Sequence, residues 1–196
     1  MSPFARFSIA TLTLTLLISV LSAAPANAQG FVGAMIGYNF GGDSGCPEIT
    51  NCEDKNLNWA VSVGALGGLF GFELEFAHIP DFFGDSPNSE SSVTTVMGNF
   101  MLAPRFGPVQ PYGNAGLGLI KTYAEVTGSG ATDDNQNAFG YNLGGGLIVT
   151  FSRHFGIRGD VRYFHAFNAL DLLGLNIGED TKIDFGRFAG GVIVKF

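Results

Sequence analysis

The sequence is short of several features that would point to other classes of protein. Its 196 residues contain only ten Lys and Arg against seventeen Asp and Glu, a net charge of −7. A chain that binds nucleic acid is expected to present a basic face, so this balance argues against that partner. The chain holds 29 glycines and interrupts every apolar run after its first segment, so no later segment predicts a membrane-spanning helix.

Cysteine is also scarce. Cys46 and Cys52 are the only two, and five residues of a polar stretch rich in Gly and Asp separate them. In an exported protein this spacing predicts a local disulfide that closes a loop, worth about 2 kcal/mol in the chain-entropy model. A zinc site would need more ligands nearby, which we do not find, so neither a metal nor another cofactor is expected.

Residues 1–28 have the pattern of a secretory signal peptide. Arg6 precedes an apolar run from Ile9 to Leu21, and Ala26-Asn27-Ala28 supplies the small-x-small pattern of a cleavage site. The run is shorter than the roughly 20 residues that span a bilayer, which disfavours a retained anchor helix. We expect cleavage after Ala28. Residues 29–196 then form one exported domain of net charge −8, because Arg6 is lost.

Eight segments alternate residue by residue between two faces, as β-strands do. One face is bulky and apolar, whereas the other carries glycine, alanine and charges but little lysine. A soluble sandwich would turn a polar face outward, whereas a membrane barrel turns large apolar residues to lipid and small or charged residues to its lumen. We therefore predict an all-β fold, a closed antiparallel eight-stranded transmembrane β-barrel of up-and-down topology; an exported soluble β-protein is the alternative. The expected strands are 31–40, 57–66, 70–79, 92–102, 111–124, 138–150, 155–165 and 183–196.

The expected connections alternate in length and sort the charges. Long connections (41–56, 80–91, 125–137 and 166–182) alternate with short ones (67–69, 103–110 and 151–154), as expected for a barrel with surface loops at one end and turns at the other. The short connections carry Arg105 and Arg153 and no acid, and the long ones carry only two bases, Lys55 and Lys182. The long connections hold thirteen acids: Asp43, Glu48, Glu53, Asp54, Asp81, Asp85, Glu90, Glu125, Asp133, Asp134, Asp171, Glu179 and Asp180.

The final segment predicts how the sheet closes. It alternates apolar residues up to the terminal Phe196, and as a free edge it would favour aggregation. Pairing with the first strand, Phe31 to Phe40, would remove both edges. Aromatic residues near the expected strand ends predict two interfacial girdles, with Tyr112 at the inner one.

These features resemble the small outer-membrane barrel families typified by the OmpA transmembrane domain, OmpX and the porin-like opacity adhesins. The matching stretches are Gly71 to Phe76, Pro111 to Gly118, Tyr141 to Gly146, Arg158 to Tyr163 and the terminal Phe196. The resemblance implies an outer-membrane location, with the lipid bilayer and lipopolysaccharide as surroundings, and a monomer. It also implies an assembly signal read by the barrel-assembly machinery, comprising Phe188, Val192, Val194 and Phe196. It leaves function open, because such barrels serve as pores, adhesins and enzymes.

Six charged residues are expected to face the lumen and to cancel one another, three acids against three bases. Buried charges need partners, so a neutral lumen charge network predicts a structural plug, with a narrow channel as the alternative. An adhesin acting through the acidic loops, toward a surface or host ligand, is a further alternative. The six residues are Glu73, Glu75, Arg158, Asp160, Arg162 and Arg187.

An enzyme is a remote alternative. The stretch around His165 resembles the lipid A deacylase motif, in which a Ser and then an Asn follow the His. His165 and Asn168 match, but Phe167 occupies the position of the nucleophile and cannot attack an ester. We therefore predict a non-enzymatic protein that contributes to envelope integrity or surface interaction.

The cysteine spacing yields a first testable prediction. Cys46 and Cys52 should resist a thiol reagent until the mature protein is reduced. A change of either to Ser should disturb loop order more than barrel stability, because the closed loop is small. Labelling of both thiols without reduction would contradict the disulfide.

The last strand yields a second prediction. Deleting Phe196 should lower the amount of heat-modifiable protein in the outer-membrane fraction, because the assembly signal would lose its terminal aromatic residue. A substitution in an acidic connection, such as Asp171→Asn, serves as the control and should leave the yield unchanged. An undiminished yield of the deletion variant would exclude Phe196 as part of the signal.

Overall fold

The computed structural model describes residues 28–41, 57–82, 89–126, 132–167 and 183–196. Their regular structure consists of eight strands, and none of the described residues forms a helix long and apolar enough to cross a membrane. The strands are β1 Gln29–Phe40, β2 Leu57–Leu66, β3 Phe70–Pro80, β4 Ser89–Leu102, β5 Val109–Val126, β6 Thr132–Thr150, β7 Phe155–Phe167 and β8 Asp184–Lys195.

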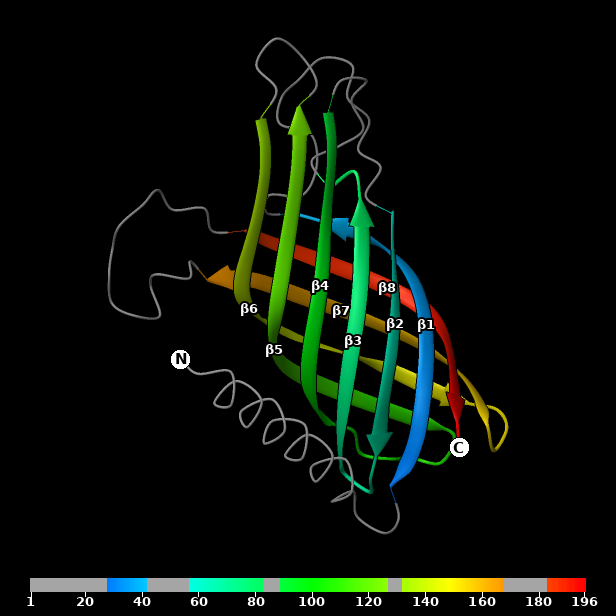
Figure 1. The fold of residues 1–196 in the computed structure, drawn as a ribbon. Coiled ribbons are helices and arrows are strands. Elements are labelled where there is room, and N and C mark those ends of the chain that lie inside the picture. The colour runs from blue at the N-terminus through cyan, green and yellow to red at the C-terminus, as the bar shows by residue number, and fades with distance from the viewer. Residues whose placement is uncertain (1–27, 42–56, 83–88, 127–131, 168–182) are drawn as a thin grey trace, which may run out of the picture.

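The strands form a closed barrel in which each pairs antiparallel with its sequence neighbour (Figure 1). The barrel closes between the first and last strands, where Phe31 pairs with Lys195 and Phe40 with Gly186. The fold class predicted from the alternating pattern is confirmed. Alternation locates the strands well because each crosses from one environment to another, with lipid on one face and the lumen on the other.

The two ends of the barrel differ. The short connections 67–69, 103–108 and 151–154 lie at one end, which we call the turn end; the opposite end is the loop end. At the loop end β5 and β6, with 18 and 19 residues, reach beyond most other strands (Figure 1). Val126 still pairs with Thr132, so the expected 125–137 connection was wrong. The sequence of residues 125–137 is polar and does not show the apolar alternation of a membrane strand. The strands nevertheless continue there, because backbone pairing does not require an apolar face.

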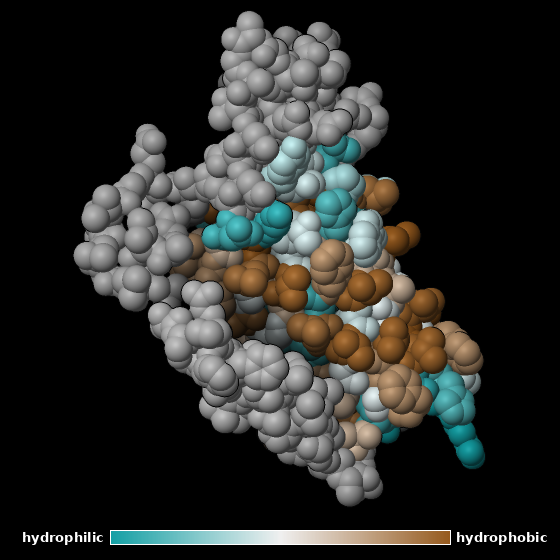
Figure 2. All heavy atoms as spheres, in the orientation of Figure 1, coloured by the Kyte–Doolittle hydropathy of each residue, from teal (hydrophilic) through white to brown (hydrophobic). Residues whose placement is uncertain are grey.

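The outer face is apolar. Ile36, Phe72 and Leu117 are 67%, 64% and 57% exposed, and each alternates with a buried neighbour. Figure 2 shows such residues gathered over the middle of the barrel, with hydrophilic groups toward both ends. This distribution is that of a surface in contact with lipid.

The lumen holds more large apolar side chains than the sequence pattern predicted. Toward the loop end Phe164 and Phe185 stack with ring centroids 4.8 Å apart, and Phe82 packs edge-on against Phe185 at 5.2 Å. Asp81, with a φ of 50°, directs the chain at the end of β3 so that Phe82 is fully buried. The expectation of small and charged lumen residues is therefore incomplete. An apolar cluster also fills the turn end: Phe31, Leu66, Met101, Ala103, Tyr112, Ile148 and Ile193.

Glycines of β6 make room for the polar layer between these two apolar clusters. A Cβ on Gly146 would lie 2.2 Å from the carbonyl oxygen of Gly159, 2.7 Å from the Cβ of Asp160 and 2.8 Å from the hydroxyl oxygen of Tyr112. A Cβ on Gly144 would lie 2.7 Å from Cγ of Arg162. These separations are too short for real carbon atoms, so the backbone of β7 and the lumen side chains occupy the space that the missing Cβ atoms leave.

This packing predicts that Gly146→Ala is destabilising. The added methyl group would collide with the carbonyl oxygen of Gly159 in β7 and with the side chains of Tyr112 and Asp160, at a cost of about 1–3 kcal/mol. The measurement is the thermal transition of the refolded barrel, followed by its heat-modifiable gel mobility. Gly113→Ala is the matched control, since its Cβ would meet its nearest atom at 3.8 Å. Equal transitions for the two variants would contradict the packing argument.

Candidate functional site

All six residues of the lumen charge network lie inside the barrel, and none is more than 3% exposed. They come from three strands, β3, β7 and β8. Each lies at one of the alternate strand positions whose side chains point inward. β3 supplies two acids, Glu73 and Glu75. β7 and β8 together supply the three arginines and Asp160. Strands far apart in sequence therefore contribute opposite charges to one layer of the lumen.

Arg162 contacts all three acids of the lumen charge network. Its Nη2 lies 2.8 Å from Oε1 of Glu73 and 2.9 Å from Oδ2 of Asp160. Its Nη1 lies 3.3 Å from Oε2 of Glu75. The planar guanidinium thus joins β7 to both acids of β3, which a lysine, as a single point charge, could not do with the same geometry.

The other two arginines contact the network from either side of Arg162. Arg187 donates from Nη2 to both carboxylate oxygens of Glu75, at 2.8 and 2.9 Å. Arg158 pairs with Glu73, and its Nη2 lies 3.2 Å from Oδ2 of Asp160. Every acid therefore contacts two arginines or more, which suits groups removed from water.

Tyr112 belongs to the same layer and was not predicted there. Its hydroxyl donates to Oδ2 of Asp160 at 2.7 Å and accepts from Nε of Arg158, also at 2.7 Å. The Arg158 guanidinium carbon lies 4.7 Å from the centre of the tyrosine ring. Placing Tyr112 in the inner aromatic girdle was wrong, because it shares its parity with Gln110 and Asn114, which are buried polar residues of β5. That parity was the available sequence signal.

A line of asparagines extends the polar layer around the lumen. Asn114 donates to Oδ1 of Asn142 at 3.0 Å, and Asn142 donates to Oδ1 of Asn99 at 2.8 Å. Asn99 in turn donates to Oε1 of Glu73 at 3.2 Å. The line links β5, β6, β4 and β3, so the polar layer reaches across the barrel from the charged strands to the uncharged ones.

The charges of this polar layer are balanced. Three acids and three bases leave no net charge, and apolar clusters lie on both sides of it along the barrel. Some buried donors, including Nε and Nη1 of Arg187, have no hydrogen-bond partner within the described residues. No three His, Cys, Asp or Glu side chains in the described ranges are grouped so that they could hold a metal ion.

The four residues of the expected assembly signal point outward. Phe188, Val192, Val194 and Phe196 are 56%, 55%, 38% and 72% exposed. The backbone nitrogen of Phe196 donates to the carbonyl oxygen of Gly30 at 2.9 Å, so the last residue still pairs with β1.

The remaining predicted sites fall in two groups. Cys46, Cys52 and Asn168 lie outside the described residues. His165 is described: its Nδ1 pairs with Asp184, and its ring lies 5.1 Å from that of Tyr141 and 5.5 Å from that of Phe167.

Comparison with known proteins agrees with this architecture. Neisserial surface protein A superposes with a TM-score of 0.59 at 16% identity, covering 86% of this chain and 97% of that one. A major outer membrane protein of Thermus thermophilus superposes with a TM-score of 0.57 at 12% identity, covering 86% and 99%. Ail, the attachment invasion locus protein of Yersinia pestis, was solved with the heparin analogue sucrose octasulfate. It superposes with a TM-score of 0.53 at 14% identity, covering 86% of this chain and 97% of that one.

At these identities the superpositions show the fold alone. Among proteins with curated descriptions, none has a significant sequence match to this chain. The family model described as the outer membrane protein beta-barrel domain matches residues 13–196. The chain therefore belongs to the outer membrane protein beta-barrel family.

Proposed function

We propose that this protein is a non-enzymatic outer-membrane barrel with a plugged lumen, which contributes to envelope integrity or to interactions at the cell surface. The observation that carries the proposal is the buried contact of Arg162 with Glu73, Glu75 and Asp160. A guanidinium held by three carboxylates is fixed in position, and an ion that entered the lumen would have to displace it. The proposal includes removal of residues 1–28 as a signal peptide before insertion.

Two further features support a closed lumen. The stacked rings of Phe164 and Phe185, with Phe82 against them, fill the lumen toward the loop end. At the turn end Phe31 and Met101 are fully buried in a second apolar cluster. Water and ions avoid both layers because nothing in them replaces hydration.

A narrow channel is the second candidate. The unpartnered donors of Arg187, Nε and Nη1, favour it, because buried donors without a protein partner are positions where water binds. In that case water would pass beside the arginines, and the apolar clusters would open as gates. The two candidates differ in a measurable quantity, the conductance of the refolded protein.

A surface adhesin is the third candidate. We infer from the alternation of connection lengths that the loop end faces outward, as in other bacterial barrels. The thirteen acids and two bases of the expected long connections would repel a sulfated polyanion such as the analogue bound to Ail. A basic partner, or lipopolysaccharide bridged by divalent cations, fits this charge better.

The absence of an enzymatic role is supported by the surroundings of His165. Its ring packs against Tyr141 and Phe167, and its Nδ1 pairs with Asp184. Phe167 has no nucleophilic atom at the position where the deacylase motif requires one.

A substitution in the lumen distinguishes the plug from the channel. Arg158→Ala removes the pairing with Glu73 and the bond to Tyr112. It should lower the stability of the barrel by about 3–5 kcal/mol where the site is dry, and less where water enters. We expect a low single-channel current for the wild type in planar bilayers and a higher one for Arg158→Ala.

Two controls accompany that measurement. Val161→Leu changes a lipid-facing residue of the same strand, 47% exposed, and Lys121→Ala removes an exposed cation outside the lumen. Both should conduct as the wild type does. A large, steady wild-type current that Arg158→Ala leaves unchanged would replace the plug with the channel.

A further inference from the structure

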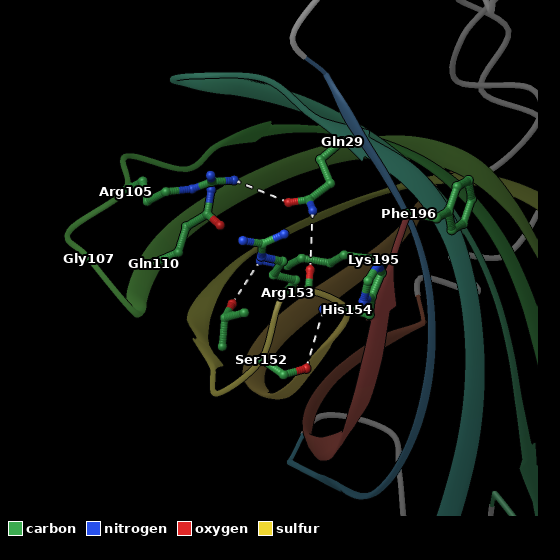
Figure 3. A pocket seen from close by; sticks show the side chains of 10 residues that line it. Gln29, Arg105, Gly107, Gln110, Ser152, Arg153, His154, Lys195 and Phe196 are labelled. Carbon is green, nitrogen blue, oxygen red and sulfur yellow. Dashed lines mark hydrogen bonds between the residues drawn. The ribbon is translucent and has the colours of Figure 1, made fainter.

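The turn end of the barrel carries a depression of about 420 Å³ that is lined mainly by polar and basic residues (Figure 3). Three bases line it: Arg105 from the β4–β5 connection, Arg153 from the β6–β7 connection and Lys195 from β8. Figure 3 shows these side chains around one space, although they come from separate parts of the sequence. The site is distinct from the lumen charge network, with which it shares no residue.

These three bases have no acidic partner among the described residues, unlike the arginines of the lumen. None of the lining residues is an Asp or a Glu. The depression therefore offers an anion a concentration of positive charge that the protein does not neutralise.

Lys195 contributes one of these positive charges, and its side chain is buried. The residue is only 3% exposed, and its Nζ lies 2.9 Å from Oγ1 of Thr150, which satisfies one of its three donors. A cation taken out of water is stabilised by an opposite charge, which the described residues do not supply.

Gln29 lies between Arg105 and the backbone of Arg153. Arg105 donates from Nη2 to Oε1 of Gln29, and Nε2 of Gln29 donates to the carbonyl oxygen of Arg153, both at 3.5 Å. These contacts are long and weak, so the Arg105 guanidinium can turn toward a ligand with little loss.

A second observation also points to a ligand. Gln110, 1% exposed, lines the depression, and its Nε2 donates to the carbonyl oxygen of Ala103 at 2.9 Å. Its Oε1 has no hydrogen-bond partner in the described structure. A buried acceptor of this kind is satisfied by a hydrogen-bond donor, so a head group that carries a donor such as a hydroxyl, as well as a negative charge, fits the depression.

The surroundings of the depression are apolar and aromatic. Phe106 follows Arg105, Phe151 and Phe155 flank the β6–β7 connection, and Phe196 follows Lys195. These four phenylalanines are 66%, 67%, 55% and 72% exposed. Each element that brings a base to the depression thus also presents an aromatic ring beside it, where acyl chains can pack.

We propose that this depression binds the phosphate of an anionic phospholipid with a hydroxyl-bearing head group, through Arg105, Arg153 and Lys195. Gln110 accepts from the head-group hydroxyl, and the exposed phenylalanines contact the acyl chains. The lipid belongs to the leaflet at the turn end. The site does not depend on whether the lumen conducts.

The test uses the refolded protein in octyl glucoside, a detergent without phosphate, and native mass spectrometry to measure lipid binding. We expect one phosphatidylglycerol per barrel. Diacylglycerol with the same acyl chains, which lacks the phosphate, should bind at least tenfold more weakly. Inorganic phosphate, which lacks the acyl chains, should also compete at least tenfold more weakly.

Substitutions of the exposed bases locate the site. Arg105→Gln and Arg153→Gln should each weaken phosphatidylglycerol binding about fivefold, the usual effect of one base near an anionic lipid surface. Both bases are exposed, so neither change should disturb folding, which heat-modifiable mobility verifies. Lys121→Gln removes an exposed cation remote from the turn end and is the matched control; it should leave binding unchanged.

Three outcomes would overturn the proposal. Diacylglycerol binding as tightly as phosphatidylglycerol would mean that the phosphate is not recognised. Inorganic phosphate binding as tightly would mean that the ligand is not a lipid. Equal affinity of the wild type, Arg105→Gln and Arg153→Gln would mean that any lipid binds elsewhere.

Discussion

The backbone pairing of β1 with β8 is the contact on which the rest of this structure depends. In a bilayer every backbone donor and acceptor must be paired within the protein, and only closure of the sheet pairs those of the first and last strands. Ten residue pairs, from Phe31 with Lys195 to Phe40 with Gly186, make this seam. Closure also creates a lumen, and a narrow lumen must be filled, which in this protein brings charged strands together.

Much of the fold could be predicted from the sequence because a membrane strand has two unlike faces. The Phe-Gly-Phe-Glu pattern of β3 identifies both its extent and the inward direction of Glu73. Two features escaped prediction for physical reasons. β5 and β6 continue as a paired ladder past the apolar zone, where alternation no longer applies. Large lumen residues such as Phe164 and Phe185 have the composition of lipid-facing ones, so only parity distinguishes the two.

The six charges of the candidate site were predictable, whereas Tyr112, the line of asparagines and the bonding between them were not. Parity placed six charges inside, whereas the role of Tyr112 depends on a glycine opposite it. The hydroxyl reaches Asp160 because Gly146 of the neighbouring strand has no side chain there. The turn-end depression could not be predicted from the sequence at all. Arg105, Arg153 and Lys195 lie far apart in the sequence, and only closure of the barrel brings them to one space.

The division of charge among the strands also bears on how the barrel folds. Glu73 and Glu75 lie on β3, whereas Arg158, Arg162 and Arg187 lie on β7 and β8, and the pairs they form span 85 to 112 residues. Before closure the early hairpins therefore carry uncompensated negative charge and the late ones a positive excess. These opposite charges attract one another, and they meet only in the lumen of the closed barrel, so the charge pairs favour the closed sheet over an open one.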